Sequence, residues 1–154
     1  MNHKSACCLM LGIGFAAAVG CGGPYDSSVS GSVLLDGNAI ETGTVSFIPM
    51  SGGPAAYARI GAGGEYTIRT GREDGLPSGE YAVTVVAHEP STVLQTADGG
   101  PPPAGKLLTP EWYRSAESSG LKYTVTPGRN KITIELSTEA PPGWKPKPPT
   151  RRRR

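Results

Sequence analysis

The stretch GEYAVTVVA, residues 79–87, decides the fold class of this 154-residue chain. Tyr81, Val83 and Val85 occupy every second position, which is the spacing of side chains on one face of a β-strand. Aromatic and β-branched residues are also enriched in strands. This stretch therefore predicts a strand whose apolar face is buried in a core.

Shorter segments with the same two-residue period lie on both sides of this strand. We expect six further strands, at residues 29–35, 43–49, 55–60, 65–69, 121–125 and 131–136. Turn sequences such as Asp36-Gly37-Asn38 separate them, because glycine and asparagine accept positive φ at little cost. Residues 110–118 suit one helical turn that begins at a proline. Seven short strands between turns predict an all-β, antiparallel sandwich.

Charge is distributed unevenly along the chain. Six basic side chains and no acidic one lie from Lys145 onward, and they include Arg151, Arg152, Arg153 and Arg154. Without these six and Lys4, eight basic side chains remain against thirteen acidic ones, so the body of the chain is acidic. Five prolines between residues 141 and 149 favour polyproline II. We expect residues 139–154 to form a disordered, Pro-rich, basic tail after a domain at residues 28–138.

The first twenty residues have the features of an export signal. Lys4 precedes an apolar run at residues 6–19, which is shorter than the roughly 20 residues of a membrane span. Small residues, Ala18-Val19-Gly20, then stand directly before Cys21. This arrangement resembles the lipobox of bacterial lipoproteins, although Ala18 replaces the usual leucine. The resemblance implies cleavage after residue 20 and lipid attachment at Cys21, with residues 21–27 as a spacer.

The alternative is an ordinary secretory peptide that leaves Cys21 as a free or paired thiol. The chain has three cysteines, and Cys7 and Cys8 lie in the predicted signal. A lipidated Cys21 therefore leaves no thiol for a disulfide or a cysteine metal site. We expect no metal and no cofactor, and a core stabilised by packing alone.

Several motifs along the chain resemble one family in their order and spacing. They are VSGSV (29–33) followed by Asp36-Gly37, GTVSF (43–47), GEYTI (64–68) and LPSGEY (76–81). These motifs resemble carboxypeptidase-regulatory-like, or transthyretin-like, domains. The later motifs PEWY (110–113), SGL (119–121) and GRN (128–130) are similar to the C-terminal half of short lipoproteins of this type in planctomycete bacteria. The resemblance covers nearly all of residues 28–137.

This resemblance implies a seven-stranded, prealbumin-like Greek-key sandwich without catalytic residues. Members of the family usually act as accessory, adhesive or structural modules, so the fold alone does not assign a function. Tyr66 and Tyr81 are expected to be core anchors, because each lies on the apolar face of its strand.

The long Pro/Gly-rich segment and the aromatic residues after it, residues 89–113, form the candidate ligand site. Trp112 and Tyr113, with Arg114 beside them, suit stacking on a sugar or a peptide. The alternative is that the two rings cap the open end of the sandwich. His88 is the only histidine after the predicted signal, so it has no histidine partner for zinc or nucleophilic catalysis. We expect a protein that is not an enzyme, and keep a hydrolase built on His88 as a third hypothesis.

The expected function is that of a non-catalytic lipoprotein of the cell envelope with a structural or interaction module. Gly22 follows the lipidated cysteine, and by resemblance to lipoprotein sorting this favours the outer over the inner membrane. Arg151 to Arg154 suit an anionic surface, an envelope protein or an acidic glycan. Nucleic acid is not expected as a partner of an exported chain. A carbohydrate- or peptide-binding module is the alternative, and the sequence leaves the oligomeric state open.

Overall fold

The computed structural model describes residues 24–91 and 99–146, and their regular structure is almost entirely β. The longer strands are β1 (Ser27–Leu35), β3 (Thr44–Pro49), β8 (Gly79–Val86) and β10 (Gly128–Leu136). The shorter strands are β2 (Asn38–Ala39), β4 (Ala56–Arg59), β5 (Glu65–Thr67), β6 (Arg69–Thr70), β7 (Glu73–Asp74) and β9 (Lys122–Val125). Two short 3-10 segments, η1 (Ala62–Gly64) and η2 (Glu111–Arg114), complete the described elements. The predicted helical turn after Pro110 is η2.

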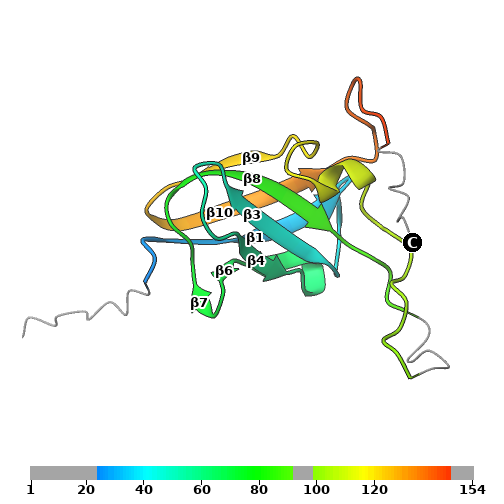
Figure 1. Cartoon of the computed structure of the whole chain (residues 1–154), viewed down its shortest axis with the longest axis horizontal. Helices are drawn as coiled ribbons and strands as arrows, with labels where there is room; N and C mark the ends of the chain where they lie inside the picture. Colours follow the sequence, from blue (N-terminus) through cyan, green and yellow to red (C-terminus); the bar gives the residue numbers. More distant parts are fainter. Residues whose placement is uncertain (1–23, 92–98, 147–154) are drawn as a thin grey trace, which may run out of the picture.

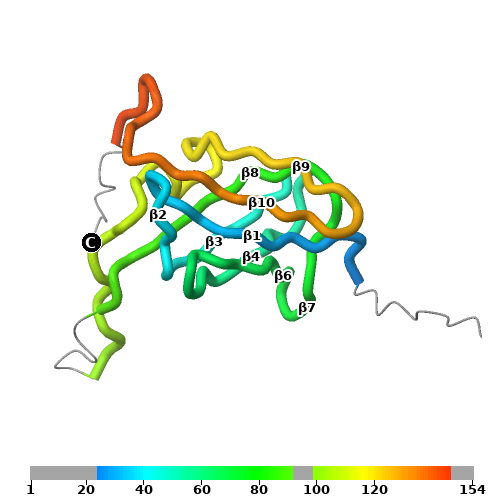
Figure 2. The backbone as a smooth tube through the Cα atoms, turned by 180° about the vertical axis from the view of Figure 1, so that it is seen from behind, coloured from blue at the N-terminus to red at the C-terminus, as the bar shows by residue number. Residues whose placement is uncertain are grey.

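The strands form two sheets that pack as two layers (Figures 1 and 2). One sheet has the order β10–β1–β2, with β5 also paired to β1, and the other has the order β7–β6–β4–β3–β8–β9. The predicted all-β sandwich is confirmed. One pair departs from the antiparallel prediction, because β1 and β10 run parallel from Ser27↔Gly128 to Leu35↔Leu136. Parallel neighbours need a long connection, and here nearly the whole domain connects them.

Two predicted strand boundaries are corrected by the pairing. The strand expected at 65–69 is split at Ile68, because β5 pairs with β1 in one sheet and β6 pairs with β4 in the other. The last strand begins at Gly128 instead of residue 131. Residues 128–130, which lie outside the strand expected at 131–136, extend the ladder with β1.

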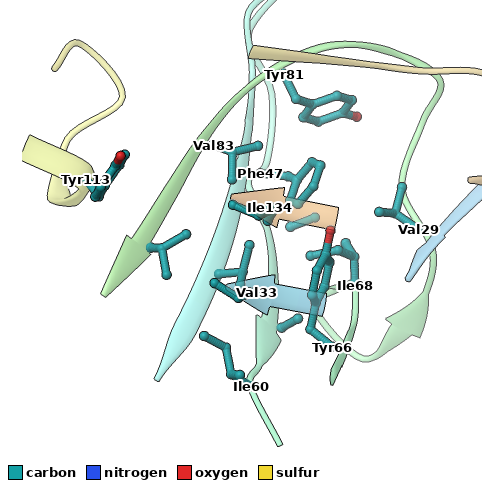
Figure 3. Close-up of a cluster of buried hydrophobic side chains, with 14 of the residues drawn as sticks. Val29, Val33, Phe47, Ile60, Tyr66, Ile68, Tyr81, Val83, Tyr113 and Ile134 are labelled. Atoms are coloured by element: carbon teal, nitrogen blue, oxygen red, sulfur yellow. The ribbon is translucent and has the colours of Figure 1, made fainter. Parts of the chain in front are cut away.

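The core lies between the two sheets and is centred on Phe47 (Figure 3). Tyr81, Val83 and Val85 of β8 are at most 2% exposed, as the alternation of residues 79–87 predicts. The Phe47 ring lies 5.9 Å from that of Tyr81 and 6.3 Å from that of Tyr66. The two tyrosines are therefore core anchors, and each hydroxyl donates to a backbone carbonyl.

Gly31 allows the Tyr66 side chain of β5 to reach across β1 to a backbone carbonyl of β10. It pairs with Tyr66 on one side and with Ile132 on the other. The Tyr66 hydroxyl donates to the Ile132 carbonyl at 2.8 Å, directly over the glycine. A Cβ at residue 31 would overlap that same carbonyl oxygen, so this position requires glycine. Burial raises the pKa of the Tyr66 phenol, which keeps it protonated as the donor.

The two ends of the sandwich differ. At the entry end, which we define by Asp26, Ser78 and Gly128, the described chain enters β1. At the loop end, defined by Asp36, the described loop residues 88–91 and 99–109, and Thr138, the chain leaves both β8 and β10. Figure 1 shows the blue N-terminal strand starting at one end and the loop after β8 extending from the other. Nine residues of β1 separate the two ends, which is about 30 Å at the usual rise per strand residue.

Candidate functional site

The base of the long loop after β8 is held by a short ladder of backbone hydrogen bonds. His88 and Leu107 form an antiparallel bridge, and the Glu89 N–H donates to the Lys106 carbonyl at 2.8 Å. A Cβ at Gly105 would overlap the Glu89 carbonyl oxygen, so the two arms approach closely. The Pro/Gly-rich segment is thus hydrogen-bonded at its base, while residues 92–98 lie outside the described residues.

Thr109 ties this base to the core. It is 1% exposed, and its hydroxyl accepts the Ala87 N–H at 3.1 Å and donates to the Val85 carbonyl at 3.3 Å. These bonds satisfy backbone groups of β8 and Ala87 beyond the end of the pairing between β8 and β9. Sequence reasoning did not identify Thr109, because a threonine next to a proline gives no sign of a bond to a strand more than twenty residues earlier.

A polar depression of about 520 Å³ lies beside the loop base. Its walls come from the start of β3, the end of β4 and both arms of the loop. Polar groups line it together with prolines, and the lining includes Thr42, Thr44, Arg59, His88, Glu89 and Pro102. One cation, one anion, an imidazole and three hydroxyls can hydrogen-bond an extended polar ligand. The depression is open and most of its lining side chains are exposed.

Trp112 and Tyr113 lie in the core, not on the surface. They are 8% and 7% exposed, and Tyr113 lies at the η2 end of the cluster in Figure 3. The Tyr113 hydroxyl accepts the Ser137 N–H at 3.0 Å, which joins η2 to the chain leaving β10. The structure therefore favours the capping alternative over stacking on a ligand. Arg114 is exposed, and no side-chain partner for it is recorded within the described chain.

Trp144 continues the aromatic cluster beyond the predicted domain boundary at residue 138. Its ring meets that of Trp112 edge-on at 5.0 Å, and it is partly buried against the core. The Trp112 indole N–H is buried, and it has no hydrogen-bond partner in the part of the chain that the structure describes. Trp144, which belongs to the predicted tail, therefore packs against the core of the domain. The rest of the predicted tail, residues 147–154, lies outside the described residues.

Two aspartates, one at each end of β1, form clasps, by which we mean paired hydrogen bonds from one distant residue to the carboxylate. At the entry end Asp26 accepts the Ser78 hydroxyl at 2.6 Å and the Ser78 N–H at 2.8 Å. At the loop end Asp36 accepts the Thr138 hydroxyl at 2.7 Å and its N–H at 3.1 Å. In both cases the hydroxyl bond first, and then the amide bond, lowers the pKa of the carboxyl group. The sequence did not indicate these clasps, whose partners are 52 and 102 residues apart.

The other predicted site residues are not described by the structure. Cys21, the predicted lipid attachment, and Arg151 to Arg154, the predicted anionic-surface contact, lie outside residues 24–146. Within the described ranges, no group of three or more His, Cys, Asp or Glu side chains could hold a metal ion. No helix among the described residues is long and apolar enough to cross a membrane.

Comparison of the chain with family models, with curated proteins and with solved structures finds no significant match.

Proposed function

We propose that this chain is an exported, non-catalytic lipoprotein of the bacterial cell envelope, with a structural or interaction module held by lipid on Cys21. The observation that carries the proposal is the series of small residues ending at Cys21, directly followed by a folded domain. β1 begins at Ser27, six residues after the cysteine. A spacer this short is consistent with a domain kept close to its anchor.

The architecture supports this proposal because anchoring leaves the loop end of the sandwich free. Lipid on Cys21 would hold the entry end, since the chain enters β1 there. The loop at residues 88–109 is at the other end, about 30 Å away along β1. More than one acyl chain makes anchoring stable. Gly22 favours the outer membrane by resemblance to lipoprotein sorting.

The surroundings of His88 support a non-catalytic role. Its backbone bridges Leu107 and its neighbour Glu89 pairs with Lys106, so both residues hold the loop base. The carboxypeptidase-regulatory-like resemblance and its Greek-key topology remain part of this proposal.

Intact mass tests the anchor. The full-length chain and a Cys21→Ala variant are expressed in a bacterium that processes lipoproteins, and membrane and soluble fractions are weighed. We expect a membrane-bound product that lacks residues 1–20 and carries diacylglycerol on Cys21, and no such product from the variant. A soluble, unlipidated wild-type product would refute the anchor and leave a freely secreted domain.

A carbohydrate- or peptide-binding module is the second candidate, and the polar depression beside the loop base favours it. Because Trp112 and Tyr113 are buried, the candidate contacts to a ligand are instead Arg59 and Glu89, which line the depression. A binding screen of envelope glycans and peptides, run with the wild type and two variants, tests this candidate. Arg59→Ala removes a side chain of the depression, and Arg72→Ala is the control, because Arg72 is an exposed arginine outside the depression. Loss of a detected ligand with the first variant alone supports the candidate. Equal binding by both variants contradicts it.

A further inference from the structure

β10 (Gly128–Leu136) is an outermost strand with a free edge. It is bonded to β1 on one side, and no strand of residues 24–91 or 99–146 lies along its other side. It is nine residues long and contains no proline. Figure 2 shows β10 running across the molecule beside β1. Free edges of this length are templates for another strand unless they are interrupted or covered.

Two hydrogen bonds show which residues of β10 face β1 and which face the free edge. The Gly128 N–H donates to the Asp26 carbonyl, and the Leu136 carbonyl accepts the Asp36 N–H, both at 2.9 Å. Backbone groups alternate between the two edges of a strand, so the even-numbered residues of β10 face β1. The odd-numbered residues then direct their N–H and C=O groups to the free edge. Their side chains are exposed, and they are Arg129, Lys131, Thr133 and Glu135.

The charges on these four residues are self-complementary in an antiparallel arrangement. The first half of the edge carries two cations and the second half carries Glu135. When two copies pair around a two-fold axis at Thr133, Lys131 of each copy faces Glu135 of the other, and the two threonines face each other. Opposite charges and threonine pairs in such positions stabilise sheets. An axis at Lys131 would instead oppose two like charges.

We propose that β10 pairs antiparallel with β10 of a second copy, around an axis at Thr133. A second copy is the partner that this pattern fits, because one strand supplies both halves of the complementarity, as a two-fold interface requires. The outer strands of the other sheet lack this charge complementarity. β7 consists of Glu73–Asp74 and would repel itself, and β9 carries one charge, Lys122, without an acidic residue to oppose it.

The pairing does not depend on lipid at Cys21, so its failure and that of the proposed anchor are separate results. Antiparallel pairing places the two entry ends at opposite ends of the strand pair, about 30 Å apart. Two copies anchored in one membrane would then hold their paired strands along its surface.

Disulfide formation in cells tests the contact and its register. Facing residues of a hydrogen-bonded antiparallel pair have Cα atoms about 5.5 Å apart, within the range of a disulfide. We expect full-length Thr133→Cys, from whichever of the membrane and soluble fractions holds the chain, to give a disulfide-linked dimer on non-reducing gels. Thr67→Cys is the matched control, because it is an exposed threonine on β5 at the other side of the same sheet. Equal dimer from both variants, or none from Thr133→Cys, contradicts the proposal.

Charge exchange tests the same pairing without cysteine chemistry. Sedimentation equilibrium of the purified full-length chain in detergent gives the dimer dissociation constant. Glu135→Lys and Lys131→Glu should each weaken the dimer about 5- to 30-fold, because each replaces two attractive pairs with two repulsive ones. The double exchange should restore the wild-type constant to within about threefold, since it reverses both partners. All these side chains are exposed, so melting temperatures measured at concentrations where the chains are monomeric should stay unchanged. A monomeric wild-type chain, or no rescue by the double exchange, would overturn the proposal.

Discussion

Replacing Thr109 with valine should destabilise the domain more than replacing it with serine. The threonine is 1% exposed, and its hydroxyl bonds the Ala87 N–H and the Val85 carbonyl. Valine preserves the shape but leaves the Ala87 N–H buried without a partner, which costs about 1–3 kcal/mol. Serine keeps the hydroxyl and removes one buried methyl, which costs about 1 kcal/mol.

Thermal and denaturant unfolding of the full-length wild type and both variants, followed by circular dichroism, measure these costs. For a domain of this size, 1 kcal/mol corresponds to roughly 4 °C in melting temperature. Thr109→Val should therefore melt about 4–12 °C lower, and Thr109→Ser about 4 °C lower. Hydrogen exchange at Ala87 gives an independent readout, because its amide should lose protection in the valine variant only.

The order of the two variants decides the interpretation. If serine destabilises more than valine, packing of the methyl holds Thr109 in place and the hydroxyl does not. In that case the loop base is not tied to β8 by this side chain, and our account of how the loop is positioned is wrong.

Three further predictions concern the strand pair and the ends of the domain. Gly31→Ala should abolish folding or cost more than about 3 kcal/mol, since the new Cβ overlaps the Ile132 carbonyl; a normal melting curve would contradict this. Asp36 has a lowered pKa, so its stabilisation is present above about pH 4 and lost as the pH falls through the folded value. Asp36→Asn should accordingly flatten the stability curve below pH 4, measured by denaturant unfolding. Trp144→Ala should cost about 1 kcal/mol of unfolding free energy, measured by denaturant unfolding, because it removes the ring packed edge-on against Trp112; unchanged stability would mean that the contact is absent in solution.

Much of the fold follows from local sequence patterns. The two-residue period places Val83 and Val85 in the core, and Asp36-Gly37 forms the expected hairpin turn, with positive φ at both residues. The direction of the β1–β10 pair does not follow from such patterns, because both directions present the same alternating side chains. The change of sheet at Ile68 is hidden for the same reason. Ile68 continues the apolar alternation while its neighbours pair with different strands.

The candidate site was predictable in its location but not in its contacts. Glycine and proline content identified the segment after β8, and the structure places a polar depression there. From the sequence alone, the aromatic pair at 112–113 is equally compatible with a ligand platform and with a cap on the sandwich. The burial of both side chains favours the cap. No local motif indicates the hydrogen bonds of Asp36 with Thr138 and of Thr109 with Ala87, because both join segments that only the tertiary fold brings together.

The two proposals together determine how the domain would sit on a membrane. A single copy held at Cys21 can stand on its entry end, which puts the loop end about 30 Å from the surface. Two copies paired through β10 must lie along the surface, because antiparallel strands carry their entry ends in opposite directions. A fluorophore at Lys106→Cys, an exposed position in the loop arm, should therefore lie closer to labelled lipids when the chain pairs. Glu135→Lys should move it away without releasing the chain from the membrane. Energy transfer that is the same in both chains would show that the paired strands do not set the orientation, even if the anchor at Cys21 is real.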